Sequence, residues 1–306
     1  MRTDLEGPLW YYGGKKRVAS VILEHFPRKA KMYVEPFFGG GGMFFQVPQE
    51  LYRVQVANDL NKSVVTFYRV LRDRTQDLLR VCKLTPFAME EQRACRNCDE
   101  DKNFDELEVA RRVWVRGNQN FGGSQSNCSG WSRPGVTKMQ SIHAEQELSK
   151  MEAYAERMRS VHMDCADACT IIERYATPDT FFYQDPPYHE ESRGPMAVYH
   201  HEMTTEQHQA LRAANEKATE AGALIMVSGY GGPFYDELYK DWRRFEFEKR
   251  NTVMTDAGEQ PVCTEVLWMN YPASMELGRN WSPLAKANNK HEQAILQALR
   301  RKGKVR

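Results

Sequence analysis

The tetrapeptide Asp185-Pro186-Pro187-Tyr188 combines residue types that can hold an amino group attached to a flat ring. It directly follows the apolar run 180–184, which predicts a buried strand, and the prolines end that strand because they donate no ladder hydrogen bonds. The Asp185 carboxylate and the Pro186 carbonyl can each accept an N–H, while the Tyr188 ring can stack on the plane. A plain type I or VI turn is the structural alternative. The position of the motif, downstream of two further features, favours the chemical interpretation.

The first of these features is the glycine run that ends the segment Glu35 to Gly42, EPFFGGGG. It follows residues 31–35, which predict a short buried strand. Glycines at the carboxyl end of a strand allow a ligand to approach the backbone closely. A flexible turn is the alternative, and a glycine run alone does not identify a cofactor.

The second feature is Asp59, which ends a second predicted strand at 52–58 and lies 19 residues after Gly40. In nucleoside-binding α/β folds, an acid at about this distance accepts hydrogen bonds from ribose hydroxyls. Asp59 can also act as a helix N-cap, and the two roles are compatible.

The elements that must position these residues alternate between helix and strand. Apolar spacing predicts helices at 14–26 and after Asp59, a strand at 180–184, a helix near 204–222 and a strand at 223–227. Segments 245–247 and 266–269 are predicted as late strands that could form an antiparallel pair. This order indicates a doubly wound α/β sheet. Between 84 and 160 the alternation stops and charged helical segments flank a polar, glycine-rich loop, which predicts an inserted, mainly helical domain.

With these motifs in this order, the chain resembles the Dam-type family of DNA adenine-N6 methyltransferases, which includes many phage and prophage members. The resemblance spans roughly 9–271 and rests on Tyr11-Tyr-Gly-Gly-Lys15, Glu35-Pro-Phe-Phe-Gly-Gly-Gly, Ala57-Asn-Asp59, Asp185-Pro-Pro-Tyr188 and Thr264-Glu-Val-Leu-Trp-Met-Asn-Tyr271. It implies a Rossmann-like, S-adenosylmethionine-dependent catalytic domain at 1–83 and 161–278, a target-recognition domain at 84–160 and a basic tail at 279–306.

The resemblance also implies roles for single residues. Asp185, Pro186, Pro187 and Tyr188 would hold the target adenine, and Asp167 would lie near the adenine of the cofactor, with Asp164 as the alternative. The full set expected at the S-adenosylmethionine site is Tyr11, Lys15, Glu35, Pro36, Phe37, Gly39, Gly41, Asp59, Asp167 and Asp185.

The expected reaction is direct methyl transfer to N6 of an adenine that has left the DNA duplex. Within the same class, cytosine-N4 and RNA adenine-N6 methylation are the alternatives. Cytosine-C5 chemistry needs a nucleophilic cysteine on a Pro-Cys loop, which this sequence lacks. An NAD-dependent Rossmann oxidoreductase fits the glycine pattern and the acid loosely, but leaves Asp185 to Tyr188 unexplained. A DNA-binding protein without activity is disfavoured by the intact Asp185.

The insert is expected to choose the sequence in double-stranded DNA. Its span 109–140 has five Lys or Arg and no Asp or Glu, as a phosphate-facing surface should. Amides can pair with adenine edges and arginines with guanine, while Phe121 and Trp131 could wedge or stack. The residues predicted to contact DNA are Arg112, Arg116, Asn118, Asn120, Arg133 and Lys138. A polar surface loop is the alternative, and the GNQNFGGSQSNCSGW loop leaves the recognised sequence open.

Composition limits the remaining possibilities. The net charge of the 306 residues is only +1, so basic patches on a neutral body fit an enzyme that visits a polyanion. Seven cysteines and no apolar leader or membrane-length run predict a reduced, cytoplasmic protein. Four of the cysteines, Cys82, Cys95, Cys98 and Cys128, are near one another in the sequence, but their spacing is irregular, so we expect no metal site. Nothing in the sequence indicates an obligate protein partner.

Overall fold

The computed structural model describes residues 5–11, 13–125, 129–131, 140–193, 202–250 and 262–278. One sheet of seven strands in the order β3-β2-β1-β4-β5-β7-β6 forms the centre of the catalytic part. The strands are β1 (Met32–Glu35), β2 (Val54–Asn58), β3 (Val161–Asp164), β4 (Thr180–Gln184), β5 (Leu224–Tyr230), β6 (Arg243–Arg250) and β7 (Val262–Met269). The first five are parallel, whereas β7 runs antiparallel to both β5 and β6. The predicted α/β sheet and the late antiparallel pair are confirmed.

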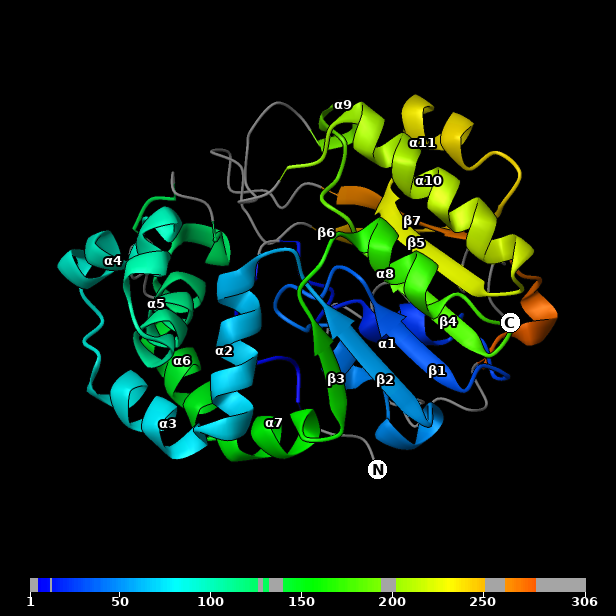
Figure 1. The fold of residues 1–306 in the computed structure, drawn as a ribbon. Coiled ribbons are helices and arrows are strands. Elements are labelled where there is room, and N and C mark those ends of the chain that lie inside the picture. The colour runs from blue at the N-terminus through cyan, green and yellow to red at the C-terminus, as the bar shows by residue number, and fades with distance from the viewer. Residues whose placement is uncertain are drawn as a thin grey trace.

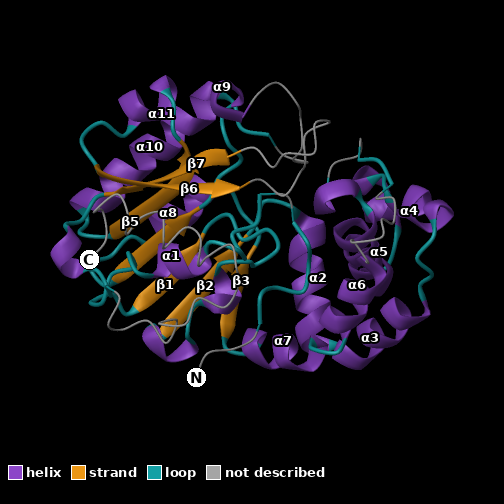
Figure 2. Cartoon of the chain, turned by 180° about the vertical axis from the view of Figure 1, so that it is seen from behind, coloured by secondary structure: helices purple, strands orange, loops and turns teal. Residues whose placement is uncertain are grey.

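Helices cover both faces of the sheet, so its central strands are apolar on both sides. Val34 and Phe182 pack on one face of the sheet with α8 (Ala168–Tyr175), α10 (Thr205–Glu220) and α11 (Pro233–Leu238). Helices α8 and α10 lie in front of the strands in Figure 1. Tyr33 and Phe181 point to the other face, where they pack with α1 (Ala19–Leu23) and α2 (Lys62–Asp73). Figure 2 shows α1 on this second face.

The insertion between α2 and β3 is a helical lobe beside the sheet (Figure 1). Its helices are α3 (Thr75–Leu84), α4 (Met89–Cys95), α5 (Glu106–Gln119), α6 (Gln140–Leu148) and α7 (Met151–Met158). Helix α5 is the centre of the lobe, because it packs on α2, α3, α4 and α6. Helix α3 ends at the predicted domain boundary but packs on α5, and thus lies with the lobe. The division at 84 and 161 remains a prediction.

Some elements differ from the sequence-based expectation. The predicted helix 14–26 is reduced to α1, and β3 with α8 was not predicted at all. A short helix α9 (Glu190–Arg193) follows the Asp185 motif, and single 3-10 turns lie at Phe44–Gln46, Gln49–Leu51, Cys98–Asn103, Phe121–Gly123 and Ala273–Met275. No helix among the described residues is long and apolar enough to cross a membrane.

Candidate active site

The strand order predicts where a ligand binds. From β1 the chain builds outward to β2 and β3 on one side, while β4 and β5 extend the sheet on the other. The loops that follow β1 and β4 therefore diverge, and ligands of open α/β sheets bind in the crevice at such a switch point. Glu35 ends β1 and Asp185 follows β4, so both motifs meet at this crevice.

The Asp185 carboxylate is held by side chains from three parts of the chain. The Lys15 ammonium donates to its two oxygens at 2.7 and 2.8 Å, and the Ser228 hydroxyl of β5 donates to Oδ1 at 3.0 Å. The Tyr188 hydroxyl lies 3.0 Å from the same oxygen. With its side chain 20% exposed, Asp185 is fixed in place yet still reachable. The structure thus brings together Lys15, Asp185 and Tyr188, as expected.

A second buried charge pair lies behind this group. Glu265 of β7 is fully buried, and its Oε1 accepts a hydrogen bond from the Tyr188 hydroxyl at 2.7 Å and lies 3.4 Å from Lys15 Nζ. Its Oε2 forms an ion pair with Lys249 of β6. Burial alone would raise the pKa of Glu265, but Lys15 and Lys249 hold it below its usual value. Glu265 is therefore ionised at neutral pH.

The loop after β1 is packed from within the chain. Gly41 has a φ of 66°, and an added Cβ there would lie 2.7 Å from the Phe45 ring. At Gly40 an added Cβ would lie 2.6 Å from Tyr11 Cβ. Tyr11 thus reaches the glycine loop, and these glycines are needed for packing. Beside them Glu35 is only 2% exposed, accepts a hydrogen bond from Tyr33 at 3.2 Å, and has its pKa raised by burial.

Asp59 reaches back to the same loop. Its Oδ2 accepts the backbone N–H of Gly39 at 2.7 Å, and its Oδ1 accepts that of Asn61 at 2.8 Å. Asn61, not Asp59, is the N-cap of α2. Pro36 and Phe37 line the start of the loop: the Pro36 carbonyl accepts from buried Asn58, and Phe37 packs on the sheet.

The two acids considered for the cofactor adenine have different settings. Asp167 is exposed and caps α8 by accepting the N–H of Cys169 at 2.9 Å. Asp164 is half-buried and accepts from Arg174 and Tyr175. Asp167 follows the carboxyl end of β3, where its exposed carboxylate can reach a ligand, and Asp164 is the last residue of that strand. The choice between the two acids stays a prediction.

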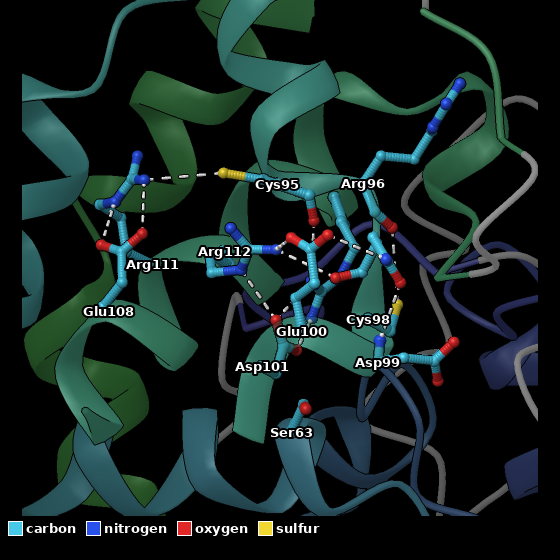
Figure 3. Close-up of polar contacts among 12 residues, drawn as sticks. Ser63, Cys95, Arg96, Cys98, Asp99, Glu100, Asp101, Glu108, Arg111 and Arg112 are labelled. Carbon is cyan, nitrogen blue, oxygen red and sulfur yellow. Dashed lines mark hydrogen bonds and ion pairs between the residues drawn. The ribbon is translucent and has the colours of Figure 1, made fainter. Parts of the chain in front are cut away.

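Two residues predicted to contact DNA are structural. Arg112 and Arg116 are 3% and 0% exposed and both bind Asp101, with Arg112 Nε 2.8 Å and Arg116 Nη2 2.6 Å from its carboxylate. Figure 3 shows the contact between Arg112 and Asp101. They also donate to backbone carbonyls, those of Ala94 and Cys95 among them. The two arginines hold the pKa of Asp101 below its usual value despite its burial. The expectation that they face DNA is therefore corrected, because both guanidinium groups are buried and pair with the buried Asp101 carboxylate.

The amides in the same span are buried as well. Asn118 donates to the Trp114 carbonyl at 2.9 Å, and Asn120 donates to the Ser124 carbonyl at 2.6 Å and accepts from Gln92 at 2.8 Å. The predicted base contacts of Asn118 and Asn120 are corrected because both amides are buried and hydrogen-bonded within the lobe. Arg133 and Lys138 lie outside the described residues. Phe121, next to Asn120, is 54% exposed.

The cysteines of the lobe are also interior. Cys95 and Cys98 are buried and hydrogen-bond to Glu91 and to the Gln125 carbonyl, respectively. Burial raises the pKa of Cys95 to about 12, so its thiol stays protonated at neutral pH. Within the described part of the chain no group of three or more His, Cys, Asp or Glu could hold a metal ion; Cys128 lies outside it.

The structure gives roles to four residues for which the sequence alone predicted none: Asn58, Ser228, Lys249 and Glu265. Glu265 carried a usable signal, because it is an acid inside the otherwise apolar strand β7 and must meet a partner there. Asn58 clamps the loops after β1 and β3 by donating to the carbonyls of Pro36 and Ala166. Lys249 could not be singled out in the same way, because six of the eight residues of its strand are charged.

Sheet, glycine loop and site acids together define a methyltransferase. A model of the D12 class N6 adenine-specific DNA methyltransferases matches residues 11–255. The chain is 27% identical over 272 residues to the Type II methyltransferase M1.LlaDCHI of Lactococcus lactis subsp. cremoris, covering 85% of this chain and 93% of that protein. It is 27% identical to the DNA adenine methylase of Vibrio cholerae, covering 86% and 95%. Against the DNA N-6-adenine-methyltransferase of Escherichia phage P1 the identity is 26%, over 75% of this chain but only 30% of that protein.

The chain therefore belongs to the D12 class N6 adenine-specific DNA methyltransferases. It is an enzyme that methylates N6 of adenine in DNA, and the predicted Dam-type membership is confirmed. This family match argues against the three alternatives, which were cytosine-N4 methylation, RNA adenine-N6 methylation and an NAD-dependent oxidoreductase.

Proposed function

We propose that the crevice between β1 and β4 binds S-adenosylmethionine beside a target adenine that has been flipped out of double-stranded DNA. The observation that carries this proposal is that the two motifs meet at the switch point of the sheet, where Glu35 ends β1 and Asp185 follows β4. Burial, together with the nearby Asp185 carboxylate, raises the pKa of Glu35 there. Placing the methyl donor next to the acceptor is the main requirement of a direct transfer.

The residues along β1 and β2 suit the cofactor. The buried Glu35 carboxyl, whose pKa is raised by burial, would be stabilised as an anion by the ammonium of the methionine moiety. The Asp59 carboxylate, which accepts the backbone N–H groups of Gly39 and Asn61 beside the glycine loop, would also accept hydrogen bonds from the ribose hydroxyls. Asp167 is proposed at the cofactor adenine. When bound, S-adenosylmethionine supplies a methyl group activated by a positively charged sulfur.

The residues after β4 suit the base. Asp185 and the Pro186 carbonyl would accept the two N6 hydrogens, which draws the N6 lone pair out of the ring and makes it more nucleophilic. The fixed Asp185 charge also stabilises the positive charge that N6 gains as the methyl group arrives. Tyr188 would stack on the base and offset the unstacking cost of a few kcal/mol. Lys15 would line the pocket and orient Asp185.

We further propose that the helical lobe reads the DNA sequence. The buried ion pairs of Asp101 make α5 a rigid support, and Phe121 extends from its end with a half-exposed ring that could enter the duplex where the base leaves. Arg133 and Lys138 are retained as proposed phosphate contacts. Exchanging 84–160 with the corresponding segment of a relative of different specificity should transfer the recognised sequence; a folded chimera that kept the original sequence would contradict this assignment.

Base flipping is tested directly by fluorescence. Once the methylated positions have been mapped, the target adenine is replaced by 2-aminopurine, whose emission rises when it unstacks. We expect a rise on binding to the wild-type enzyme, because flipping separates the base from its neighbours. Emission that stayed at the level of the free duplex, with binding verified independently, would contradict flipping.

The predicted cytoplasmic location stays a prediction.

A further inference from the structure

The hairpin of β6 and β7 reaches the active site from the far edge of the sheet. Since β7 runs antiparallel to β5, its amino end lies beside the carboxyl end of β5, where Glu265 pairs with Tyr230. On β6, Phe247 pairs with Glu265, and Lys249 follows two residues later on the same face. The topology thus places one acid and one base of the hairpin behind the Asp185 motif.

Glu265 contacts the side chains that position Asp185 and does not contact Asp185 itself. It hydrogen-bonds to Tyr188 at 2.7 Å and lies 3.4 Å from Lys15, which are the two side chains that hold or flank Asp185. Lys249 neutralises its other oxygen and lies 5.1 Å from the centre of the Tyr230 ring. That ring in turn meets the Tyr188 ring edge-on at 4.7 Å.

The charges explain why two lysines are present. Two carboxylates, the half-buried Asp185 and the fully buried Glu265, share Lys15, whose side chain is only 2% exposed. Among the described residues, Lys15 is the cation that Glu265 would keep without Lys249. Glu265 would then draw Lys15 away from Asp185, because a buried carboxylate needs a close counter-charge. Lys249 therefore leaves Lys15 available to Asp185.

We propose that Glu265 is a positioning residue for methyl transfer, which fixes the Tyr188 ring and the Lys15 ammonium, and that Lys249 acts only through Glu265. This inference rests on the proposed function of the site. It assigns no contact with the cofactor or the adenine to either residue. Two results are therefore expected. Loss of Glu265 should reduce kcat more than it weakens cofactor binding, and loss of Lys249 should not change kcat further in a variant that already lacks Glu265.

The test uses Glu265→Gln, Lys249→Met, Lys249→Arg and the double variant Lys249→Met/Glu265→Gln. We expect Glu265→Gln to lower kcat about tenfold or more, as when a group that preorganises a site is lost, with the dissociation constant of S-adenosylmethionine changed less than about twofold. Lys249→Met should lower kcat less, Lys249→Arg should restore it, and the double variant should match Glu265→Gln, because the two losses are not independent.

The exposed ion pair of Lys240 and Glu237, 2.8 Å apart on the surface, provides matched controls. Lys240→Met and Glu237→Gln should leave kcat unchanged. Melting temperatures and cofactor binding report folding; if Glu265→Gln fails to fold, the comparison of Lys249→Met with Lys249→Arg decides. The inference is overturned if a folded Glu265→Gln variant keeps kcat within twofold of wild type, or if Lys249→Met and Lys249→Arg behave alike. A wild-type enzyme that transferred no methyl group would instead refute the proposed function.

Discussion

Replacing Asp101 by asparagine should destabilise the helical lobe strongly. The Asp101 carboxylate is 4% exposed and lies 2.6–3.1 Å from nitrogens of Arg112 and Arg116. Asparagine leaves two guanidinium groups in the interior without their counter-charge, which costs about 3–5 kcal/mol for a broken buried pair. For a chain of this size that corresponds to a fall in melting temperature of roughly 5–8 °C.

Scanning calorimetry measures this fall, with Asp99→Asn at the neighbouring exposed acid as the control. A second experiment, on the variant Arg116→Met, distinguishes a structural role of Arg116 from a DNA-binding role. If Arg116 contacted a phosphate, Arg116→Met would reduce the salt dependence of DNA binding by about one ion. We expect an unchanged salt slope and a lower melting temperature. A variant that melted like wild type but lost about one unit of slope would refute the structural reading.

Three further changes test the site and its surroundings. Asp185→Asn should lower kcat at least about a hundredfold with cofactor affinity largely kept, as measured by transfer of labelled methyl groups and by calorimetry; near-normal turnover would remove Asp185 from the mechanism. Asp59→Ala should weaken S-adenosylmethionine binding by about 1–3 kcal/mol, and unchanged calorimetric affinity would exclude it from the site. Burial, with His189 nearby, lowers the pKa of His208 to about 4, below the value of about 6.5 for an unfolded chain. Its neutral form therefore contributes stability that is complete above about pH 6.5 and is lost by up to about 3 kcal/mol as the pH falls toward 4; urea unfolding of His208→Gln should show a weaker acid dependence than wild type or the exposed-residue control His162→Gln, and equal curves would contradict the assignment.

The sequence predicted the central strands and the motifs at their ends because local signals agree there. The apolar run 180–184 is strand β4, and the prolines end it where expected. Strand β3 was missed because four residues, VHMD, with an exposed His162 give too short a pattern to separate from a loop. Helix α1 is shorter than predicted because residues 13–18 form turns before it begins.

The partners of charged side chains could not be read from the sequence. The span 109–140 lacks acids, but Asp101 and Glu91 reach it from upstream once α4 and α5 pack together. The arginines of α5, Arg111, Arg112 and Arg116, therefore form ion pairs within the lobe instead of a DNA-facing surface. In the same way, Lys15 and Asp185 are 170 residues apart, and only the packed sheet shows that they form one group.

This chain methylates N6 of adenine in DNA, and we propose that the transfer takes place at the site built around Asp185. The most direct test incubates the protein with duplex DNA and S-adenosylmethionine labelled in the methyl group, digests the DNA to nucleosides and identifies the labelled product by chromatography and mass spectrometry. We predict labelled N6-methyldeoxyadenosine with wild type and a loss of that product with Asp185→Asn. Label in N4-methyldeoxycytidine, or an undiminished product with the variant, would contradict the account.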